Sequence, residues 1–327
     1  MKKKIFITGG AGYVGCALAD YLAEEDYDVT VYDLMIYGDQ VFQNRDKITI
    51  IKGDIRNIDL LNKSLTNQET LIHLACISND PSFELNPGLG KSINLDAFEP
   101  LVRASIKKGI RRFIYASSSS VYGIKKEKNV HEEMALKPLT DYSKFKAECE
   151  KILFKYKSDN FETTVIRPAT VCGFSVRQRL DVIVNILTNL AFHKNEITVL
   201  GGDQLRPNIH IKDMIRSYKL LIDADKDLIN GEIYNSGWEN QSVNNIAEEV
   251  RSVVGLNVKI IKKETNDNRS YHISSEKLKN KLGFKTMFTI KNAVEDLKKA
   301  FQNKYFNDPL NNELYFNIKR MNNLKLK

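Results

Sequence analysis

The sequence KIFIT at residues 4–8, followed directly by GGAGYVG at residues 9–15, decides the fold of this 327-residue chain. The first part is short, apolar and rich in β-branched and aromatic residues, which is typical of a buried strand. The second part is a glycine-rich turn, and the apolar pattern of CALADYLAEED at residues 16–26 predicts a helix after it. The chain therefore begins with a strand, a glycine loop and a helix in immediate succession.

The three spaced glycines of this loop, Gly9, Gly12 and Gly15, fit a dinucleotide-binding turn. In such a turn the first glycine allows a tight bend, the second lets the backbone approach a pyrophosphate, and the third lets the helix pack closely on the strand. The next predicted strand, DVTVYD, ends in Asp33, about 20 residues beyond the loop, where an acid binds adenosine ribose hydroxyls. A carboxylate there repels a 2′-phosphate, which predicts NAD over NADP. The alternative reading of Asp33 is a turn former at a strand end.

Short apolar strands continue to alternate with helices through the first half of the chain. This alternation predicts an α/β fold, a doubly wound parallel Rossmann sheet. The further strands are ITIIKGD at 48–54, TLIHLA at 70–75, RFIYA at 112–116 and TTVIR at 163–167, with a helix over 95–107. After Arg167 the regular alternation of strands and helices ends, although GEIYNSG at 231–237 is typical of another strand of the same sheet.

We expect the end of this alternation to mark the start of a smaller C-terminal substrate-binding domain. Residues 1–172 with about 205–240 would form the NAD-binding domain, and about 173–204 with 241–303 the substrate domain. The tail, 304–327, is rich in Asn and Lys with interspersed aromatics. It is open whether the tail packs on the second domain, packs on a partner subunit or is partly disordered.

Proton-handling side chains cluster between Ser117 and Lys146. SSSSVYG at 117–123 follows a buried strand, and the carboxyl ends of parallel strands are where ligands bind. Tyr-x-x-x-Lys occurs three times, but only Tyr142/Lys146 lies in a predicted helix, where a spacing of four puts both side chains on one face. This pair is therefore the candidate site, against the alternative of an ordinary surface contact.

The composition excludes several other classes of protein. The net charge of +8 is scattered along the chain without a nucleic-acid-binding motif, so we expect a solvated basic surface. The four cysteines have no metal-ligand or secreted spacing, which predicts reduced thiols and no metal. No apolar segment approaches the roughly 20 residues of a membrane helix. The start, MKKKIFITGG, ends in glycines and predicts a strand, not a signal peptide. We expect a cytoplasmic protein that binds neither nucleic acid nor membrane.

With these residues in view, the chain resembles the extended short-chain dehydrogenase/reductase family, and within it the nucleotide-sugar epimerases and dehydratases. The resemblance runs from about Lys3 to about Lys299. Its supporting strings, in order, are TGGAGYVG, Asp33, GDI at 53–55, HLA at 73–75, IN at 93–94, SSSSVYG, Tyr142 with Lys146, RP at 167–168, LRPNIHIKD at 205–213, YNSG at 234–237 and LGF at 282–284.

The resemblance implies a role for each matching residue. The catalytic set is Ser118 as a hydroxyl, Tyr142 as the acid/base and Lys146 as its partner. The NAD-binding set is Gly9, Gly12, Tyr13, Val14 and Gly15 at the pyrophosphate, Asp33 at the ribose, Asp54 and Ile55 at the adenine, and Leu74, Ala75, Asn94, Tyr142 and Lys146 at the nicotinamide half. The substrate-binding set is Asn79, Ser118, Arg206 and Arg269. Arg177 and Arg179 are added to it because guanidinium groups recognise phosphate, against the alternative of ordinary surface charges. A free tyrosine has a pKa of about 10, which Lys146 and a nicotinamide cation would lower toward the working pH.

Departures from the family pattern narrow the reaction. The 4,6-dehydratases carry Asp and Glu directly after the catalytic hydroxyl, whereas Ser119 and Ser120 stand here, which disfavours dehydration. Thr170 replaces an Asn that epimerases often use. We therefore expect NAD-dependent oxidation at C4 of a nucleotide-diphosphate sugar, with a 4-epimerase favoured. The alternatives are a 4-dehydrogenase or ketoreductase, for example on a GDP-linked heptose, and a non-catalytic dinucleotide-binding protein. The resemblance also implies a homodimer through the Tyr142 helix and the 95–107 helix.

Overall fold

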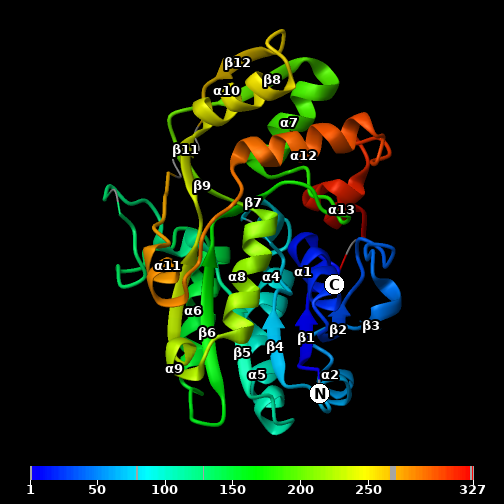
Figure 1. Cartoon of the computed structure of the whole chain (residues 1–327), viewed down its shortest axis with the longest axis vertical. Coiled ribbons are helices and arrows are strands. Elements are labelled where there is room, and N and C mark those ends of the chain that lie inside the picture. Colours follow the sequence, from blue (N-terminus) through cyan, green and yellow to red (C-terminus); the bar gives the residue numbers. More distant parts are fainter. Residues whose placement is uncertain (1, 79, 128, 266–269, 325, 327) are drawn as a thin grey trace.

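The computed structural model describes residues 2–78, 80–127, 129–265, 270–324 and 326. Within these residues the main sheet has seven parallel strands in the order β10-β6-β5-β4-β1-β2-β3 (Figure 1). They are β1 (Lys4–Thr8), β2 (Asp28–Asp33), β3 (Ile48–Lys52), β4 (Thr70–His73), β5 (Arg112–Ala116), β6 (Glu162–Pro168) and β10 (Glu232–Ser236). The predicted doubly wound parallel sheet is confirmed, with the GEIYNSG stretch as its seventh strand.

Helices cover both faces of this sheet. Successive side chains of a strand point to opposite faces, so Ile5 and Ile7 enter one core cluster and Phe6 enters another. The helices of the first face are α1 (Tyr13–Glu24) and α8 (Ile211–Asp223), and those of the second are α2 (Ile58–Ser64), α5 (Phe98–Lys107) and α6 (Asp141–Phe154). The continuous apolar runs of the strands follow from this burial on both faces.

The strand order reverses between β1 and β4, which are neighbours in the sheet although β2 and β3 come between them in the chain. At such a switch point the loops after the two strands diverge and open a crevice at the carboxyl edge. The glycine loop after β1 and the segment after β4 therefore flank the same crevice.

A second group of elements stands beyond this edge, at the top of Figure 1. Three helices, α7 (Ile183–Lys194), α10 (Val243–Val254) and α12 (Ile290–Gln302), share a separate apolar core. A parallel pair, β8 (Glu196–Leu200) with β12 (Lys259–Lys263), covers them. The strands β7 (Thr170–Cys172), β9 (Leu205–His210) and β11 (Glu239–Ser242) form a three-stranded sheet that links this group, here termed the cap, to the main sheet. The separate core supports the proposed domain division.

Short helical segments complete the described fold. They are α3 (Asp80–Glu84), α4 (Pro87–Lys91), α9 (Lys226–Ile229), α11 (Glu276–Leu282) and α13 (Asn317–Leu324), with the turns η1 (Arg45–Lys47), η2 (Ser92–Asp96), η3 (Ser119–Tyr122) and η4 (Glu313–Tyr315). The helix expected over 95–107 begins only at Phe98, because the residues before it form the π-helical η2. None of the helices described is long and apolar enough to cross a membrane.

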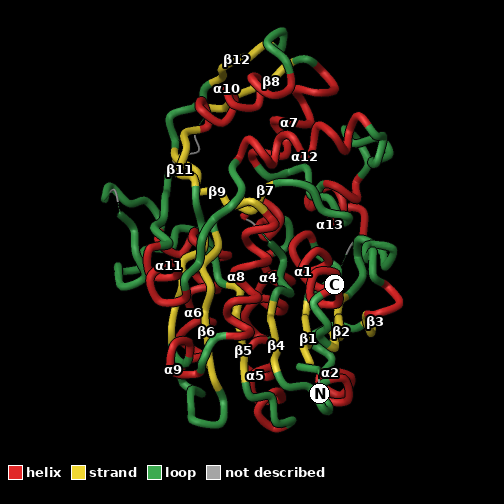
Figure 2. Tube along the Cα trace, in the orientation of Figure 1, coloured by secondary structure: helices red, strands yellow, loops and turns green. Residues whose placement is uncertain are grey.

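The C-terminal tail is folded and reaches the crevice. Phe306 is buried with Leu297 and Phe301 in a small aromatic core beside the cap. Beyond η4 the chain continues into α13, which Figures 1 and 2 show beside the carboxyl ends of β1 and β2. The tail therefore packs on the cap, which is one of the alternatives that the sequence left open. It also reaches the NAD-binding half of the molecule.

Candidate active site

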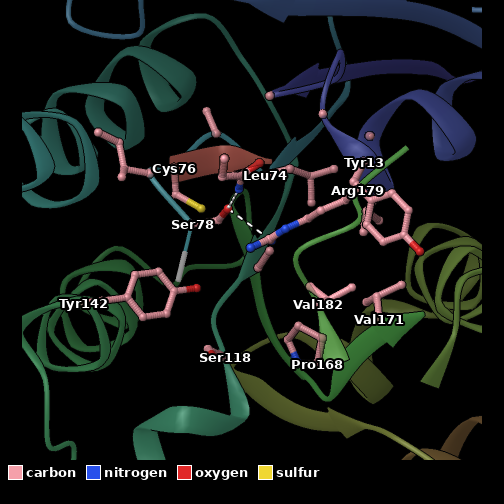
Figure 3. A pocket seen from close by; sticks show the side chains of 18 of the residues that line it. Tyr13, Leu74, Cys76, Ser78, Ser118, Tyr142, Pro168, Val171, Arg179 and Val182 are labelled. Atoms are coloured by element: carbon pink, nitrogen blue, oxygen red, sulfur yellow. Dashed lines mark hydrogen bonds between the residues drawn. The ribbon is translucent and has the colours of Figure 1, made fainter. Parts of the chain in front are cut away.

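A cavity of about 490 Å³ lies at the carboxyl edge of the main sheet, a size typical of small-molecule sites (Figure 3). Its walls combine the loops after β1, β2, β4 and β5 with the first turns of α6, part of the cap and the tail. The expected site residues that line it are Gly9, Gly12, Tyr13, Val14, Gly15, Asp33, Ile55, Leu74, Ala75, Ser118, Tyr142, Lys146, Arg177, Arg179 and Arg206. The fold therefore gathers most of the expected residues around one space.

The glycine loop turns tightly into α1. Gly9 has a φ of +73°, a left-handed conformation that favours glycine, and an added Cβ would lie 2.5 Å from the backbone nitrogen of Ala75. At Gly15 an added Cβ would lie 2.4 Å from the Gly9 carbonyl oxygen. At Gly12 an added Cβ would lie 3.2 Å from the same oxygen. Apart from Gly12 itself and its chain neighbours, no other heavy atom of the described residues lies within 4 Å of that Cβ. The backbone at Gly12 thus faces open space within the cavity wall.

Asp33 lies at the end of β2 and braces this loop. Its Oδ2 accepts a hydrogen bond from the Ala11 amide at 3.0 Å, and its Oδ1 accepts one from the Met35 amide at 2.7 Å. Burial raises the pKa of Asp33, while these two amides and the charge of Arg177 act to lower it. Each carboxylate oxygen still has a lone pair for a ligand hydroxyl.

Two other expected NAD-binding residues lie behind the wall. The carboxylate of Asp54 pairs with Arg56 at 2.6 Å, so that the next residue, Ile55, is the one that faces the cavity. The amide of Asn94 bonds both backbone groups of Ile77, accepting from the nitrogen at 2.8 Å and donating to the oxygen at 3.0 Å. Asn94 therefore shapes the wall indirectly.

Tyr142 and Lys146 lie on one face at the start of α6. Thr140 caps this helix, since its hydroxyl accepts from the Ser143 amide at 3.3 Å while the Ser143 hydroxyl accepts from the Thr140 amide at 3.1 Å. The buried Lys146 ammonium donates to the Ala116 carbonyl at 2.7 Å and lies 5.9 Å from the centre of the Tyr142 ring. The lysine thus ties α6 to the end of β5.

The end of β5 also places Ser118, which Figure 3 shows on the same side of the cavity as Tyr142. The Ser118 hydroxyl lies 2.9 Å from the Ser120 hydroxyl and accepts from the Ser120 amide at 3.2 Å. The other two Tyr-Lys pairs lie elsewhere. Tyr122 is buried in η3 and hydrogen-bonded to Asn235, and Tyr315 belongs to η4.

Burial raises the pKa of Tyr142 well above its usual value. Cys76 and Asp80 act in the same direction, whereas Arg179 and a hydrogen bond with Ser118 lower this pKa. Burial thus favours the phenol of Tyr142 over its phenolate. The expectation that Lys146 and a nicotinamide cation lower this pKa applies to the enzyme with its cofactor bound and stays a prediction.

Arg177 and Arg179 both enter the cavity from the loop before α7. Arg177 lies 3.5 Å from the centre of the Tyr37 ring and is 4% exposed. Arg179 pairs with Asp181 at 2.6 Å and donates to Ser78 at 3.3 Å, as Figure 3 shows. The buried Nε of Arg177 and Nη2 of Arg179 have no hydrogen-bond partner among the described residues. Each guanidinium group is bonded through its other nitrogens, and two such positive charges in the wall of one cavity suit an anionic ligand.

Residues 5–237 match the family model described as the NAD dependent epimerase/dehydratase family. The chain belongs to this family. Its membership makes it an NAD-dependent enzyme of the extended short-chain dehydrogenase/reductase type, in a group that acts on nucleotide sugars.

Similar proteins in the family carry out different reactions. UDP-glucose 4-epimerase of Lactobacillus helveticus is 25% identical over 274 residues, which cover 78% of this chain and 83% of the relative. The solved UDP-glucose 4-epimerase of Thermotoga maritima has a TM-score of 0.83 at 23% identity, covering 92% of this chain and 99% of its own. The dTDP-glucose 4,6-dehydratase of Streptomyces venezuelae also has a TM-score of 0.83, at 18% identity, covering 94% and 99%. Fold similarity alone does not separate epimerase from dehydratase.

The cavity fits the cofactor of the family. The backbone at Gly12 is open to the cavity, which leaves room for a pyrophosphate, and the positive charges of Arg177 and Arg179 in the cavity wall attract anionic oxygens. Asp33 presents a carboxylate, which suits free ribose hydroxyls and repels a 2′-phosphate. These features agree with NAD as the cofactor.

Of the remaining residues expected to bind substrate, one lines the cavity and two lie outside the described residues. Arg206, on β9, lines the cavity with its guanidinium 5.6 Å from the centre of the Tyr271 ring. Asn79 and Arg269, both expected to bind substrate, lie outside the described residues.

Sequence reasoning did not single out four of the residues that line the cavity, namely Tyr37, Ser78, Asp181 and Asn317. Tyr37 follows Asp33 closely enough that a search of the β2 loop would have found it. Ser78 is next to the singled-out Asn79, and Asp181 is part of the SVRQRLD string. Asn317 carries no sequence signal, because it is one Asn among many in a tail without a recognisable motif.

Proposed function

We propose that this family member is a nucleotide-sugar 4-epimerase, which oxidises C4 of a nucleotide-diphosphate sugar and returns the hydride to the opposite face. The observation that carries the proposal is the arrangement of Tyr142 and Ser118 at one side of a cavity that also contains the glycine loop. A sugar hydroxyl placed between the two side chains would meet both a proton acceptor and a hydrogen-bond donor. Bound NAD would supply the hydride acceptor.

Tyr142 is the proposed acid/base. In the forward step its phenolate takes the proton of the C4 hydroxyl as the C–H bond to C4 breaks, and a ketone forms. In the return step the phenol gives the proton back to the oxygen. Because burial raises the pKa of Tyr142, the positive charges of Lys146, Arg179 and the oxidised nicotinamide are needed to make the phenolate accessible.

Ser118 is the proposed hydrogen-bond donor to the oxygen on C4. Its hydroxyl bonds Ser120 at 2.9 Å and is not fixed by a charged group in the described structure, so it is able to turn to a substrate oxygen. Lys146 has a positioning role, because its bond to the Ala116 carbonyl fixes the distance between α6 and the serine row.

The serines after Ser118 support epimerisation over dehydration. Elimination of water needs a second acid and base beside the ketone. Ser119 and Ser120 carry hydroxyl groups, so neither position supplies a carboxyl group. Ser119 is 3% exposed, and the Ser120 hydroxyl bonds Ser118. The carboxylate that influences Tyr142 is Asp80, which accepts a hydrogen bond from Thr140 at the cap of α6.

We also propose the NAD and substrate contacts expected from the sequence, except that we assign the charges of Arg177 and Arg179 to the diphosphate of the dinucleotide. The glycine loop, Asp33 and Ile55 lie at the adenosine end, and Leu74, Ala75 and Lys146 beside Tyr142 at the catalytic end. Arg206, on the cap side, suits the diphosphate of the sugar nucleotide. A homodimer through α5 and α6, which pack together on one face of the sheet, remains a proposal that light scattering would test.

The test of the function is to supply purified protein with UDP-, GDP- and dTDP-linked hexoses and heptoses and to follow both sugar and cofactor. A 4-epimerase gives an isomerised sugar by NMR without net NADH absorbance. Accumulation of a 4-ketosugar together with stoichiometric NADH would contradict the proposal and favour the 4-dehydrogenase. A 4-keto-6-deoxy product would instead identify a dehydratase.

A further inference from the structure

The C-terminal helix α13 shares the cavity with the glycine loop. Asn317, Met321 and Leu326 line the same space as Gly12 and Asp33, although about 300 residues separate them in the sequence. Met321 and Leu326 also pack against the core cluster that contains Ile55, the residue expected beside adenine. The tail therefore covers the adenosine end of the cavity.

Asn317 is the point at which the tail joins the other walls. Its Oδ1 accepts hydrogen bonds from the Tyr37 hydroxyl at 2.7 Å and from Arg177 Nη2 at 2.8 Å, and its Nδ2 donates to the Ser78 hydroxyl at 2.9 Å. Its backbone nitrogen donates to Asp181 at 2.8 Å. One side chain, 5% exposed, thus connects the loop after β2, the loop after β4 and the loop before α7.

These bonds fix the two arginines of the cavity. Arg177 is held between the Tyr37 ring and Asn317, and Arg179 is held by Asp181, which also accepts from the Asn317 backbone. Both guanidinium groups keep one buried nitrogen without a described partner. Arg177 lies close enough to Asp33 to influence its pKa, which places it at the adenosine end. The geometry thus directs this cation to the dinucleotide side of the cavity.

Hydrogen bonds anchor the tail on both sides of Asn317 in the sequence. On the cap side, the Tyr315 carbonyl accepts from the Leu180 amide at 2.8 Å, and the Pro309 carbonyl accepts from Asn189 at 2.8 Å. Beyond Asn317, Arg320 donates to the Ile36 carbonyl at 2.5 Å. The segment is therefore docked along its length and bridges the cap to the loop after β2.

We propose that Asn317 is a positioning residue of the NAD site and that α13 closes this site, so that NAD leaves only when the tail undocks. Asn317 aims Arg177 and Arg179 at the diphosphate of the dinucleotide, while Met321 covers the adenosine. The inference rests on the proposed function for its purpose. An enzyme that returns the hydride to the same sugar must keep the reduced cofactor in place between its two half-reactions.

The experiment measures how fast the full-length protein releases NAD in the absence of any sugar. Protein loaded with radiolabelled NAD is chased with excess unlabelled NAD, and retained label is followed by rapid filtration. Asn317→Ala should release label at least about tenfold faster than the unaltered protein, which corresponds to the loss of about one charge-assisted hydrogen bond. Asn322→Ala is the matched control, an exposed Asn of the same helix, and should release label at the unaltered rate.

The tail position is checked in parallel by limited proteolysis. Faster release in Asn317→Ala, together with faster cleavage within 304–327, supports the proposal. Equal release rates in Asn317→Ala and the unaltered protein would overturn it. If Asn317→Ala does not fold, Tyr37→Phe removes one bond to the Asn317 amide, and Arg320→Ala loosens the far end of α13. Unchanged release in both of these folded variants would equally overturn the proposal.

Failure of the proposed function gives a different result. An enzyme that retains NAD through the tail but isomerises no sugar refutes the epimerase assignment and leaves the tail proposal intact. An enzyme that isomerises sugars with equal NAD release in all variants refutes the tail proposal alone.

Discussion

The adenosine end and the catalytic end of the cavity use polar side chains in opposite ways. At the adenosine end, both oxygens of Asp33 accept backbone amides and the Asn317 amide bonds three side chains. At the catalytic end, Ser118 and Ser120 bond mainly to each other. Hydrogen bonds to fixed amides and charges hold a geometry, whereas hydroxyl pairs rotate to suit a new partner. This difference fits the proposed roles of the two ends, cofactor retention at one and proton exchange with a substrate at the other.

The two ends also differ in where their residues come from. The proposed catalytic side chains all come from one stretch, Ser117 to Lys146, around a single strand-to-helix connection. The adenosine end joins residues from Gly9 to Met321. A local site depends on a few backbone angles, whereas a composite one depends on the docking of distant segments. We therefore expect substitutions at the two ends to separate turnover from cofactor retention.

The largest effect is expected from Tyr142→Phe. Loss of a positioned acid/base typically lowers the rate by about 10²–10⁴-fold, so kcat for the sugar should fall in that range. NAD retention, measured by label release, should change far less than kcat, because Tyr142 supplies only one of the proposed contacts to the cofactor. Tyr27→Phe, which removes a surface hydroxyl bonded to Asp223, is the control. Unchanged turnover would refute the mechanism, and loss of NAD would show that the two ends are not separate.

Asp33→Asn should produce the converse result. Hydrogen bonds to a charged group contribute about 1.5–3 kcal/mol, so NAD should bind roughly 10- to 100-fold more weakly, with kcat little changed at saturating NAD. The preference over NADP should also decrease, because the repelling charge is gone and Arg177 is nearby. Asp39→Asn, an exposed acid paired with Arg45, is the control. Titration of both cofactors by fluorescence measures the effect, and an unaltered NAD/NADP ratio would contradict the assigned role.

The pH dependence of kcat should respond to two charged residues in opposite directions. Burial raises the pKa of Tyr142, so the phenolate fraction, and with it kcat at saturating NAD, should increase as the pH rises. Arg179 lowers this pKa, so Arg179→Met should move the rising limb to higher pH. Asp80 raises it, so Asp80→Asn should move the limb to lower pH. Shifts of the same sign in both variants would show that Tyr142 does not govern the limb.

Features that depend on local geometry were predictable from the sequence. The strand-loop-helix start follows from the apolar KIFIT run and from glycines whose replacement would bring atoms within 2.5 Å of the backbone. The pairing of Tyr142 with Lys146 over the other two Tyr-Lys pairs follows from helix periodicity and the cap at Thr140. In each case neighbouring residues determine the conformation.

Features that depend on docking of distant segments were not predictable. Asn94 matches a family string, but its amide is taken up by Ile77, 17 residues away. Arg177 was expected at the sugar nucleotide, but the sequence did not indicate that Tyr37 and Asn317 would hold its guanidinium group. The tail has no glycine, capping or periodic signal that specifies the surface it covers. Its place follows from contacts such as Asn317 with Ser78, across 239 positions.

The smallest effect is expected from Ser120→Ala, which tests how freely the catalytic hydroxyls exchange partners. The substitution removes the Ser120 hydroxyl at 2.9 Å from Ser118 but keeps the Ser120 amide that donates to Ser118 at 3.2 Å. A single neutral hydrogen bond contributes about 0.5–1.5 kcal/mol, so kcat should fall by roughly two- to tenfold, with NAD release unaltered. Ser118→Ala should lower kcat far more, because it removes the proposed hydrogen-bond donor to the substrate oxygen. If Ser120→Ala were as damaging as Ser118→Ala, the two serines would act as one fixed unit. The catalytic end would then be as rigid as the adenosine end.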